Sequence, residues 1–234
     1  MTSLDGTREK SMAKDFQSEE VVAGYDTHIR KLIPGYELVH QQIDAILSAY
    51  LPEAAHILIV GCGTGYELSY LLQRHPQWQF TAIDPSLTML QQAQRNIDLC
   101  KGKERVEFIQ ADTQSLNQVN QFDAALAILV AHFIPQDHKT DFFQDICQSL
   151  KPEGVLLSYD LMQHEDATEL KVMQQLAQHT GLNAKQSEKM IARLEQDFHL
   201  ISAENLTALL TKVGFKRSRI YCQIMSYYGF LAHK

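Results

Sequence analysis

The stretch from Ile57 to Glu67 constrains this chain more than any other. Four apolar residues, Ile57 to Val60, run into a loop in which glycine occupies every second position, at 61, 63 and 65. An apolar run of this length that ends in a glycine turn is typical of a buried parallel strand turning into a helix. Glycine is required where the backbone takes positive φ or where a ligand approaches closer than a Cβ allows. The first N–H groups of the following helix are also unpaired. The stretch therefore predicts a ligand site made of backbone.

The spacing of the glycines distinguishes between ligands. A dinucleotide fingerprint, G-x-G-x-x-G, has its third glycine where this chain has Tyr66. The pattern here is G-x-G-x-G, which resembles motif I of the class I S-adenosylmethionine (SAM)-dependent methyltransferases. A tight strand-to-helix turn without a ligand is the alternative reading of the motif taken alone.

Two acidic residues follow at the spacing of successive strand-and-helix units. Phe80 to Ile83 reads as a second strand that ends in Asp84. The distance from Gly61 to Asp84 is close to the roughly 20 residues that separate a phosphate loop from a ribose-binding carboxylate. Val106 to Ile109 reads as a third strand, and Asp112 follows it. Either carboxylate alone could be the N-cap of the next helix. Together behind the glycine strand they favour a binding role over two separate caps, and the resemblance places the adenine contact at Asp112.

The resemblance implies a set of cofactor contacts. The cofactor would be S-adenosyl-L-methionine, with Asp84 on the ribose and the segment at Asp112 and Thr113 on the adenine. Tyr25 and Tyr36 lie in a segment that commonly covers the cofactor in this family, and Met89 is read either as core filler or as an adenine contact. The predicted cofactor-binding residues are Tyr36, Gly61, Cys62, Gly63, Asp84, Pro85, Met89, Asp112, Thr113, Ile128 and Leu129.

The remaining periodicity predicts one α/β domain over residues 1–234. We expect a Rossmann-like, mostly parallel sheet of seven strands, with helices on both faces and an antiparallel C-terminal strand pair. One helix over residues 21–32 and a second from 38 to 51 would form an N-terminal helical cover (13–52), after a frayed polar start before about Met12. Lys151 to Gly154 reads as a turn before a fifth strand over 155–159. Two helices within 162–200 read as a lid insertion, and a last helix from Ser202 would stop at Gly214.

The composition limits the kinds of partner that we expect for this chain. The formal net charge is −7 for 234 residues, which argues against nucleic acid and favours a small-molecule acceptor. Apolar runs fall short of the roughly 20 residues of a membrane span, so we expect no membrane partner and a cytoplasmic protein. The four cysteines are widely spaced and indicate no metal site. A homodimer is compatible with the sequence.

Within the superfamily the chain is similar to the carboxy-SAM synthase branch of tRNA wobble modification and its methyltransferase-like neighbours. The shared stretches are Ile33–Tyr36, Gly61–Gly63, Glu165–Ala167 and Leu194–Glu195. That branch uses an arginine to hold an extra carboxylate on the transferred carbon of its cofactor. Counted without gaps, the equivalent of that arginine here is Ile191. The fourth-strand asparagine of that branch corresponds to Ile128. Arg193 would point about 200° away from position 191 on a helix. We therefore expect plain SAM and methyl transfer, without prephenate-dependent carboxy-SAM synthesis.

The mechanism implied is direct displacement, in which positioning supplies most of the rate and a base is optional. His132 could act as a general base, although packing beside the fourth strand is the favoured reading, and the catalytic residues stay unassigned. A SAM-binding protein without turnover is the alternative from another class of function.

Overall fold

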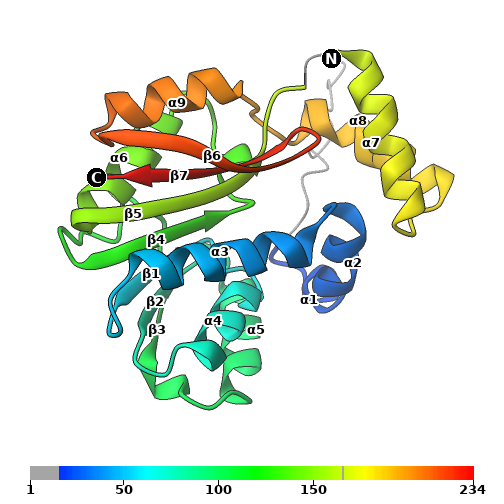
Figure 1. Ribbon diagram of the computed structural model, residues 1–234. Coiled ribbons are helices and arrows are strands. Elements are labelled where there is room, and N and C mark those ends of the chain that lie inside the picture. Colours follow the sequence, from blue (N-terminus) through cyan, green and yellow to red (C-terminus); the bar gives the residue numbers. More distant parts are fainter. Residues whose placement is uncertain (1–15, 165) are drawn as a thin grey trace, which may run out of the picture.

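The computed structural model describes residues 16–164 and 166–234, and its centre is a seven-stranded sheet in the order β3-β2-β1-β4-β5-β7-β6 (Figure 1). The predicted frayed start before Met12 lies outside the described residues, as does Glu165. The strands are β1 (His56–Val60), β2 (Gln79–Ile83), β3 (Val106–Ile109), β4 (Phe122–Ile128), β5 (Leu150–Leu161), β6 (Arg217–Ile224) and β7 (Tyr227–His233).

The strand directions confirm the predicted sheet. Strands β1 to β5 are parallel, whereas β7 pairs antiparallel with both β5 and β6. Strand order reverses between β1 and β4, and ligands of such sheets bind outside the carboxyl ends of the strands at this point. One boundary differs from expectation: β5 begins at Leu150 and includes the predicted turn, where Lys151–Gly154 interrupt the pairing with β4 and Glu153 has φ of 66°.

Helices cover both faces of the sheet, and the alternation of each strand divides the core between them (Figure 1). Ile57 and Ile59 of β1 face the cluster that includes α3 (Tyr36–Tyr50), α4 (Tyr66–Arg74) and α5 (Leu87–Asp98). Leu58 and Val60 face the cluster that includes α6 (Lys139–Ser149) and α9 (Ala203–Lys212). A strand buried on both faces explains the continuous apolar run that precedes the glycine loop.

The N-terminal cover begins with two short helices where the sequence predicted one. Helix α1 (Glu19–Ala23) ends at Gly24, and α2 (Tyr25–Leu32) starts directly after it. Glycine weakens a helix interior because it loses more conformational freedom than other residues, which accounts for the break. Gly214, at φ 113°, follows α9 as predicted.

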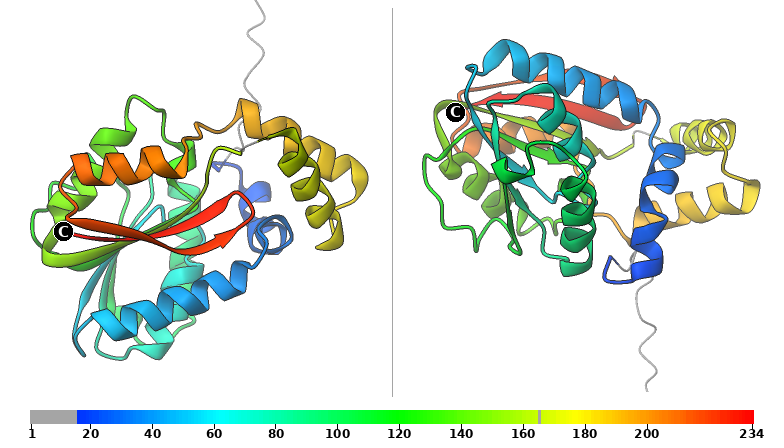
Figure 2. Two further views of the ribbon diagram at one scale, coloured as in Figure 1. Left: turned by 45° about the horizontal axis from the view of Figure 1, so that its top comes forward. Right: turned by 90° about the horizontal axis from the view of Figure 1, so that it is seen from below.

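Two helices stand beyond the end of the sheet, next to α1 and α2 (Figures 1 and 2). They are α7 (Ala167–His179) and α8 (Ala184–Gln196), and they contact each other. Asn183 begins α8 with a reciprocal capping box to Gln186. The predicted pair of helices in the insertion is thus confirmed, whereas its opening as a lid stays a prediction. Among the described residues, no helix is long and apolar enough to span a bilayer.

Candidate functional site

The glycine loop after β1 has the backbone that its sequence predicted. Gly61, Gly63 and Gly65 have φ of 64°, 53° and 82°. A Cβ on Gly61 would lie 2.6 Å from a methyl carbon of Val130, and one on Gly65 would lie 3.1 Å from the Cβ of Ala93. A Cβ on Gly63 would meet nothing within 4 Å. Two of the glycines therefore serve packing, and Gly63 leaves open space at the start of α4 where a ligand can approach the backbone.

Asp84 joins this loop to the end of β2. Its Oδ2 accepts the N–H of Gly63 at 2.9 Å, and its Oδ1 accepts the N–H of Ser86 at 2.8 Å. Ser86 in turn caps α5, which fixes the turn that carries the carboxylate. Burial raises the pKa of Asp84, and no ion pair offsets that burial among the described residues. Each oxygen keeps a free lone pair, so the carboxylate can accept two hydroxyl donors such as those of a ribose.

Other acidic groups gather near the same loop. Asp26 of α2 accepts the hydroxyl of Thr64, and Glu67 of α4 lies 3.1 Å from Nε2 of His40. Burial raises the pKa of Tyr25, and the charges of Glu67, Asp26 and Asp84 raise it further. A ligand with positive charge would be favoured here, and SAM carries a sulfonium and an ammonium group. Backbone access, a ribose acceptor and local negative charge together fit this cofactor.

A cavity of about 310 Å³ lies between the ends of β1, β2, β3 and β4. It is lined by four of the predicted cofactor residues, Gly61, Pro85, Asp112 and Thr113. Asp112 lies on its surface, where the Ser115 hydroxyl and N–H donate to Oδ1 and lower the pKa of the carboxyl. A carboxylate oxygen has two lone pairs, so Asp112 can still accept an amine, which the predicted adenine contact requires.

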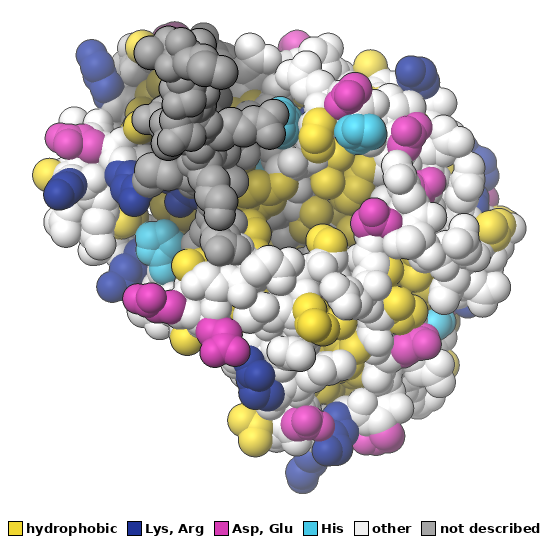
Figure 3. Space-filling view, turned by 180° about the vertical axis from the view of Figure 1, so that it is seen from behind, with side chains coloured by type: hydrophobic (Ala, Val, Ile, Leu, Met, Phe, Trp, Pro, Cys, Tyr) yellow, Lys and Arg dark blue, Asp and Glu magenta, His cyan; other side chains and the backbone are white. Residues whose placement is uncertain are grey.

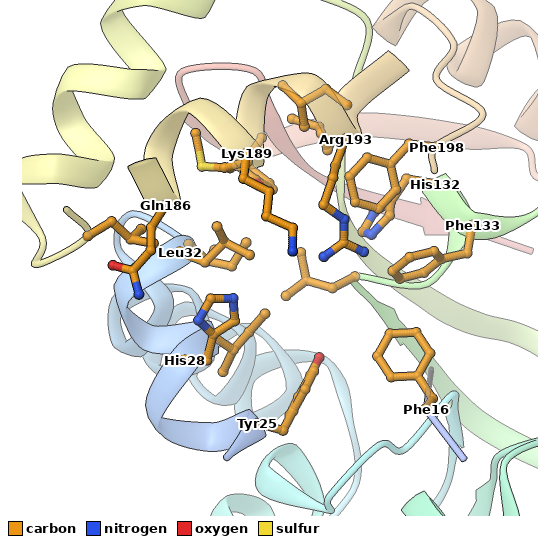
Figure 4. Close-up of a pocket in the computed structure, with 18 residues that line it drawn as sticks. Phe16, Tyr25, His28, Leu32, His132, Phe133, Gln186, Lys189, Arg193 and Phe198 are labelled. Atoms are coloured by element: carbon orange, nitrogen blue, oxygen red, sulfur yellow. The ribbon is translucent and has the colours of Figure 1, made fainter. Parts of the chain in front are cut away.

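A larger cavity, of about 340 Å³, lies between α2, the ends of β4 and β5, and α8 (Figure 4). Its wall is mostly apolar and aromatic, and the space-filling view shows hydrophobic side chains gathered in a hollow on one face of the molecule (Figure 3). Leu129 lines it with φ of 60°, which is rare for a branched residue and typical of functional sites. The size and lining suit a small organic molecule.

A buried polar cluster adjoins this cavity. His132 lies in the short 3-10 helix η2 (Ala131–Phe133), and its Nδ1 is 2.9 Å from Oδ1 of Asp160, although not in line for a good hydrogen bond. Asp160 is fully buried in β5. Lys139 is also buried, its ammonium donates to the carbonyl of Ala131, and burial lowers its pKa to about 8 against the opposing charge of Asp160. The lysine therefore fixes the turn that carries His132.

Two cations of α8 also point into the larger cavity (Figure 4). They are Lys189 and Arg193, four residues apart and so on one face of the helix. Nε of Arg193 pairs with Asp197 at 2.5 Å, and among the described residues Lys189 has no ion pair. The expectation that Arg193 would point away from the site was wrong. Arg193 lines the cavity, whereas Ile191 packs against the core, so position 193 and not position 191 faces the site.

The other predicted residues contribute less directly. Ile128 ends β4 and is 7% exposed. Cys62 and Met89 have buried side chains that line neither of the two cavities. The ring of Tyr36 packs at a tilt against His40 and Tyr66 and also lines neither cavity. The N–H and carbonyl of Cys62 already bond to Ile83 and Gly65. The cofactor roles of all the predicted site residues, these three included, stay predictions.

Sequence reasoning missed the acidic partner of His132 and the cations of α8. Asp160 stands in the apolar run Val155–Leu161, and a charge inside a buried strand is a usable signal because such groups are rarely buried without a partner. No comparable signal marks Lys189, since a lysine on an amphipathic helix is ordinarily solvated.

Comparison with known proteins finds methyltransferase domains and carboxy-S-adenosyl-L-methionine synthases. A family model described as a methyltransferase domain matches residues 57–154, from β1 to the middle of β5. The chain is 23% identical over 228 residues to carboxy-S-adenosyl-L-methionine synthase of Shewanella sediminis, covering 94% of this chain and 93% of that protein. It is 26% identical to the synthase of Hydrogenovibrio crunogenus, with 94% and 90% covered.

Solved structures share the fold. The 1,6-didemethyltoxoflavin-N1-methyltransferase of Burkholderia thailandensis, solved with its substrate and S-adenosylhomocysteine, superposes with a TM-score of 0.56 at 20% identity, covering 92% of this chain and 88% of that one. Phosphoethanolamine N-methyltransferase 2 of Haemonchus contortus, solved with SAM, gives 0.64 at 19% identity, with 87% and 43% covered. The chain has the class I SAM-dependent methyltransferase fold and distant full-length homology to carboxy-SAM synthases, as the sequence predicted.

Proposed function

We propose that this chain is a SAM-dependent methyltransferase that transfers the methyl group of plain SAM to a small acidic molecule by direct displacement. The observation that carries the proposal is the pairing of Gly63 with Asp84 beside two cavities at the strand-order reversal. The cavity at Asp112 would hold the adenine. The larger cavity, beyond Leu129, would hold the acceptor.

The chain's own residues would bind and orient both reactants. Asp84 accepts the ribose hydroxyls, and the open backbone at Gly63 admits the amino-acid tail. The apolar wall of the larger cavity excludes water from the reacting atoms. When bound, SAM supplies an activated methyl group, so alignment of the acceptor is the main demand on the protein.

Lys189 and Arg193 support an acidic group on the acceptor. Both extend into the larger cavity from α8, with Asp197 as the one carboxylate paired to them among the described residues. A carboxylate or similar anion placed there would be stabilised by charge-assisted hydrogen bonds.

The same cations favour a second candidate, carboxy-SAM synthesis. In that case Arg193 would pair with a carboxylate on the transferred carbon, the role that the ungapped count gave to the apolar Ile191. The apolar Ile128 still argues against it, because it offers that carboxylate no hydrogen bond.

One experiment separates the candidates. The purified protein is incubated with SAM alone, with SAM and prephenate, and with labelled SAM and a set of small organic acids, and the products are identified by mass spectrometry. A methylated acid without carboxylated SAM supports our proposal. A carboxylated sulfonium in the prephenate sample overturns it in favour of the second candidate. Tight binding of S-adenosylhomocysteine with no product in any sample indicates a SAM-binding protein without turnover.

A further inference from the structure

Asp160 is a charged group with few partners. It is fully buried, its Oδ2 makes no hydrogen bond among the described residues, and its Oδ1 accepts the backbone N–H of His132 at 3.3 Å. Lys139 is the nearby cation, but its ammonium is used by the carbonyl of Ala131 and no ion pair joins it to Asp160 within the described chain. A buried carboxylate in this position favours a positive charge on whatever group faces it.

The group that faces it is the imidazole of His132. Nδ1 lies 2.9 Å from Oδ1 of Asp160, and although the pair is not in line for a good hydrogen bond, the charge of that carboxylate favours a proton on Nδ1 of the neutral ring over one on Nε2. Nε2 then carries the lone pair, and it makes no hydrogen bond among the described residues. The ring lines the larger cavity, so Nε2 is the nitrogen left for a molecule bound there (Figure 4).

The surroundings of His132 are aromatic. Phe133 and Phe198 lie with ring centroids 4.4 and 4.9 Å from the imidazole and 5.1 Å from each other. Phe16 continues this wall, 5.5 Å from Phe133. Aromatic rings at these separations favour a planar aromatic ligand, which can add another stacked or edge-to-face contact.

We propose that His132 is the general base of the methyl transfer and that the acceptor is a phenol, with Asp160 as a positioning residue. The inference rests on the proposed function and deepens it. An oxygen lone pair of the hydroxyl forms the O–C bond while the C–S bond breaks and its electron pair stays on sulfur. The hydroxyl proton passes to Nε2 of His132, and Asp160 stabilises the imidazolium that results. Methyl ether, S-adenosylhomocysteine and one proton are the products.

The competing reading is structural: Asp160 could serve only to anchor the backbone of His132. A test must therefore follow the proton as well as the rate. The probe is 4-nitrophenol, whose phenolate absorbs visible light, and its matched control is 4-nitroanisole, which has no proton to lose.

Binding is measured first, with S-adenosylhomocysteine present throughout. In wild type, bound 4-nitrophenol should ionise at a lower pH than free 4-nitrophenol. In His132→Asn that lowering should disappear, while 4-nitroanisole binds both proteins within about twofold. His199→Asn is the control histidine variant, because the hydrogen bond from His199 to the carbonyl of His132 is donated by its backbone N–H, which the substitution keeps. Absence of 4-nitrophenol binding, or ionisation unchanged by His132→Asn, overturns the proposal.

The rate of methyl transfer to 4-nitrophenol is measured next. General-base assistance is typically worth about 10²–10⁴-fold, so His132→Asn should lower kcat by at least about 100-fold with KM for SAM unchanged. The acidic limb of the pH profile should also move to the pH at which free 4-nitrophenol ionises. Charged or titratable groups near His132 also affect that limb, and they are Asp160 on β5, Lys139 on α6, Lys189 and Arg193 on α8, His28 on α2 and His199 after α8.

Asp160→Asn tests the positioning role. Because it leaves Lys139 buried without its counter-charge, it is compared with Asp160→Asn/Lys139→Met, which removes both charges. Both variants should shift the acidic limb to lower pH and lower kcat less than His132→Asn does. A loss of stability with an unmoved pH profile overturns that role. If the wild-type protein does not bind S-adenosylhomocysteine, the proposed function itself is overturned.

Discussion

Alanine at Gly61 and at Gly63 should cause different defects, although the two residues share a loop and a similar φ. An alanine in the left-handed region costs about 1–2 kcal/mol at either position. At Gly61 the new Cβ would also lie 2.6 Å from Cγ2 of Val130, a stiff β-branched side chain, and overpacking adds about 1–3 kcal/mol. We expect Gly61→Ala to lower the free energy of unfolding by about 2–5 kcal/mol. Gly63→Ala, with nothing within 4 Å, should lower it by only about 1–2 kcal/mol.

The two variants should rank in the opposite order in their effect on ligand affinity. The space beside Gly63 is where the amino-acid tail of SAM would approach the backbone, so Gly63→Ala should weaken S-adenosylhomocysteine binding by at least tenfold in calorimetry. Urea denaturation measures the stability of each variant. Adding Val130→Ala to Gly61→Ala closes a double-mutant cycle. The double variant should recover the stability lost through overpacking and keep the loss caused by the positive φ. Equal destabilisation by the two alanines, or unchanged affinity in Gly63→Ala, would refute this division of roles.

Three further outcomes are expected. Asp84→Asn should weaken S-adenosylhomocysteine binding by about 1.5–3 kcal/mol in calorimetry, because an amide nitrogen cannot accept a ribose hydroxyl; unchanged affinity contradicts the ribose role. Hydrogen exchange in α7 and α8 should slow when S-adenosylhomocysteine binds, and equal protection with and without it counts against a lid. Lys139 loses its proton at about pH 8 when folded but near 10.5 when unfolded, so its contribution to stability rises with pH between these values. At about 1.4 kcal/mol for each pH unit, the gap between 10.5 and 8 limits that rise to about 3 kcal/mol, and the slope should be absent from Lys139→Met.

Local sequence patterns predicted the parts of the fold that depend on local chemistry. The strands β1 to β3 and their ends at Gly61, Asp84 and Asp112 follow from apolar runs that stop at glycine or at a carboxylate. Parallel strands bring their carboxyl ends to one edge, so order along the chain was enough to gather these residues.

The contacts that were missed join residues distant in sequence. Asp160 is 28 residues from His132, and no periodicity reports that β4 and β5 place them 2.9 Å apart. The orientation of Arg193 depends on how α8 packs, which an ungapped count along the chain cannot show. The break at Gly24 was readable, since a glycine stood inside the predicted helix, but the apolar series across it outweighed that signal.

Helix α2 contributes to both halves of the site. Asp26 accepts the hydroxyl of Thr64 on the glycine loop, while Ile29 and Leu32 of the same helix line the larger cavity. A displacement of this one rigid element therefore changes the free energy of binding at both places. Linkage then requires reciprocity: whatever factor the cofactor adds to the affinity for the acceptor, the acceptor adds to the affinity for the cofactor. After transfer, departure of the methylated product would loosen α2 and so lower the affinity for S-adenosylhomocysteine, which gives product release a preferred order.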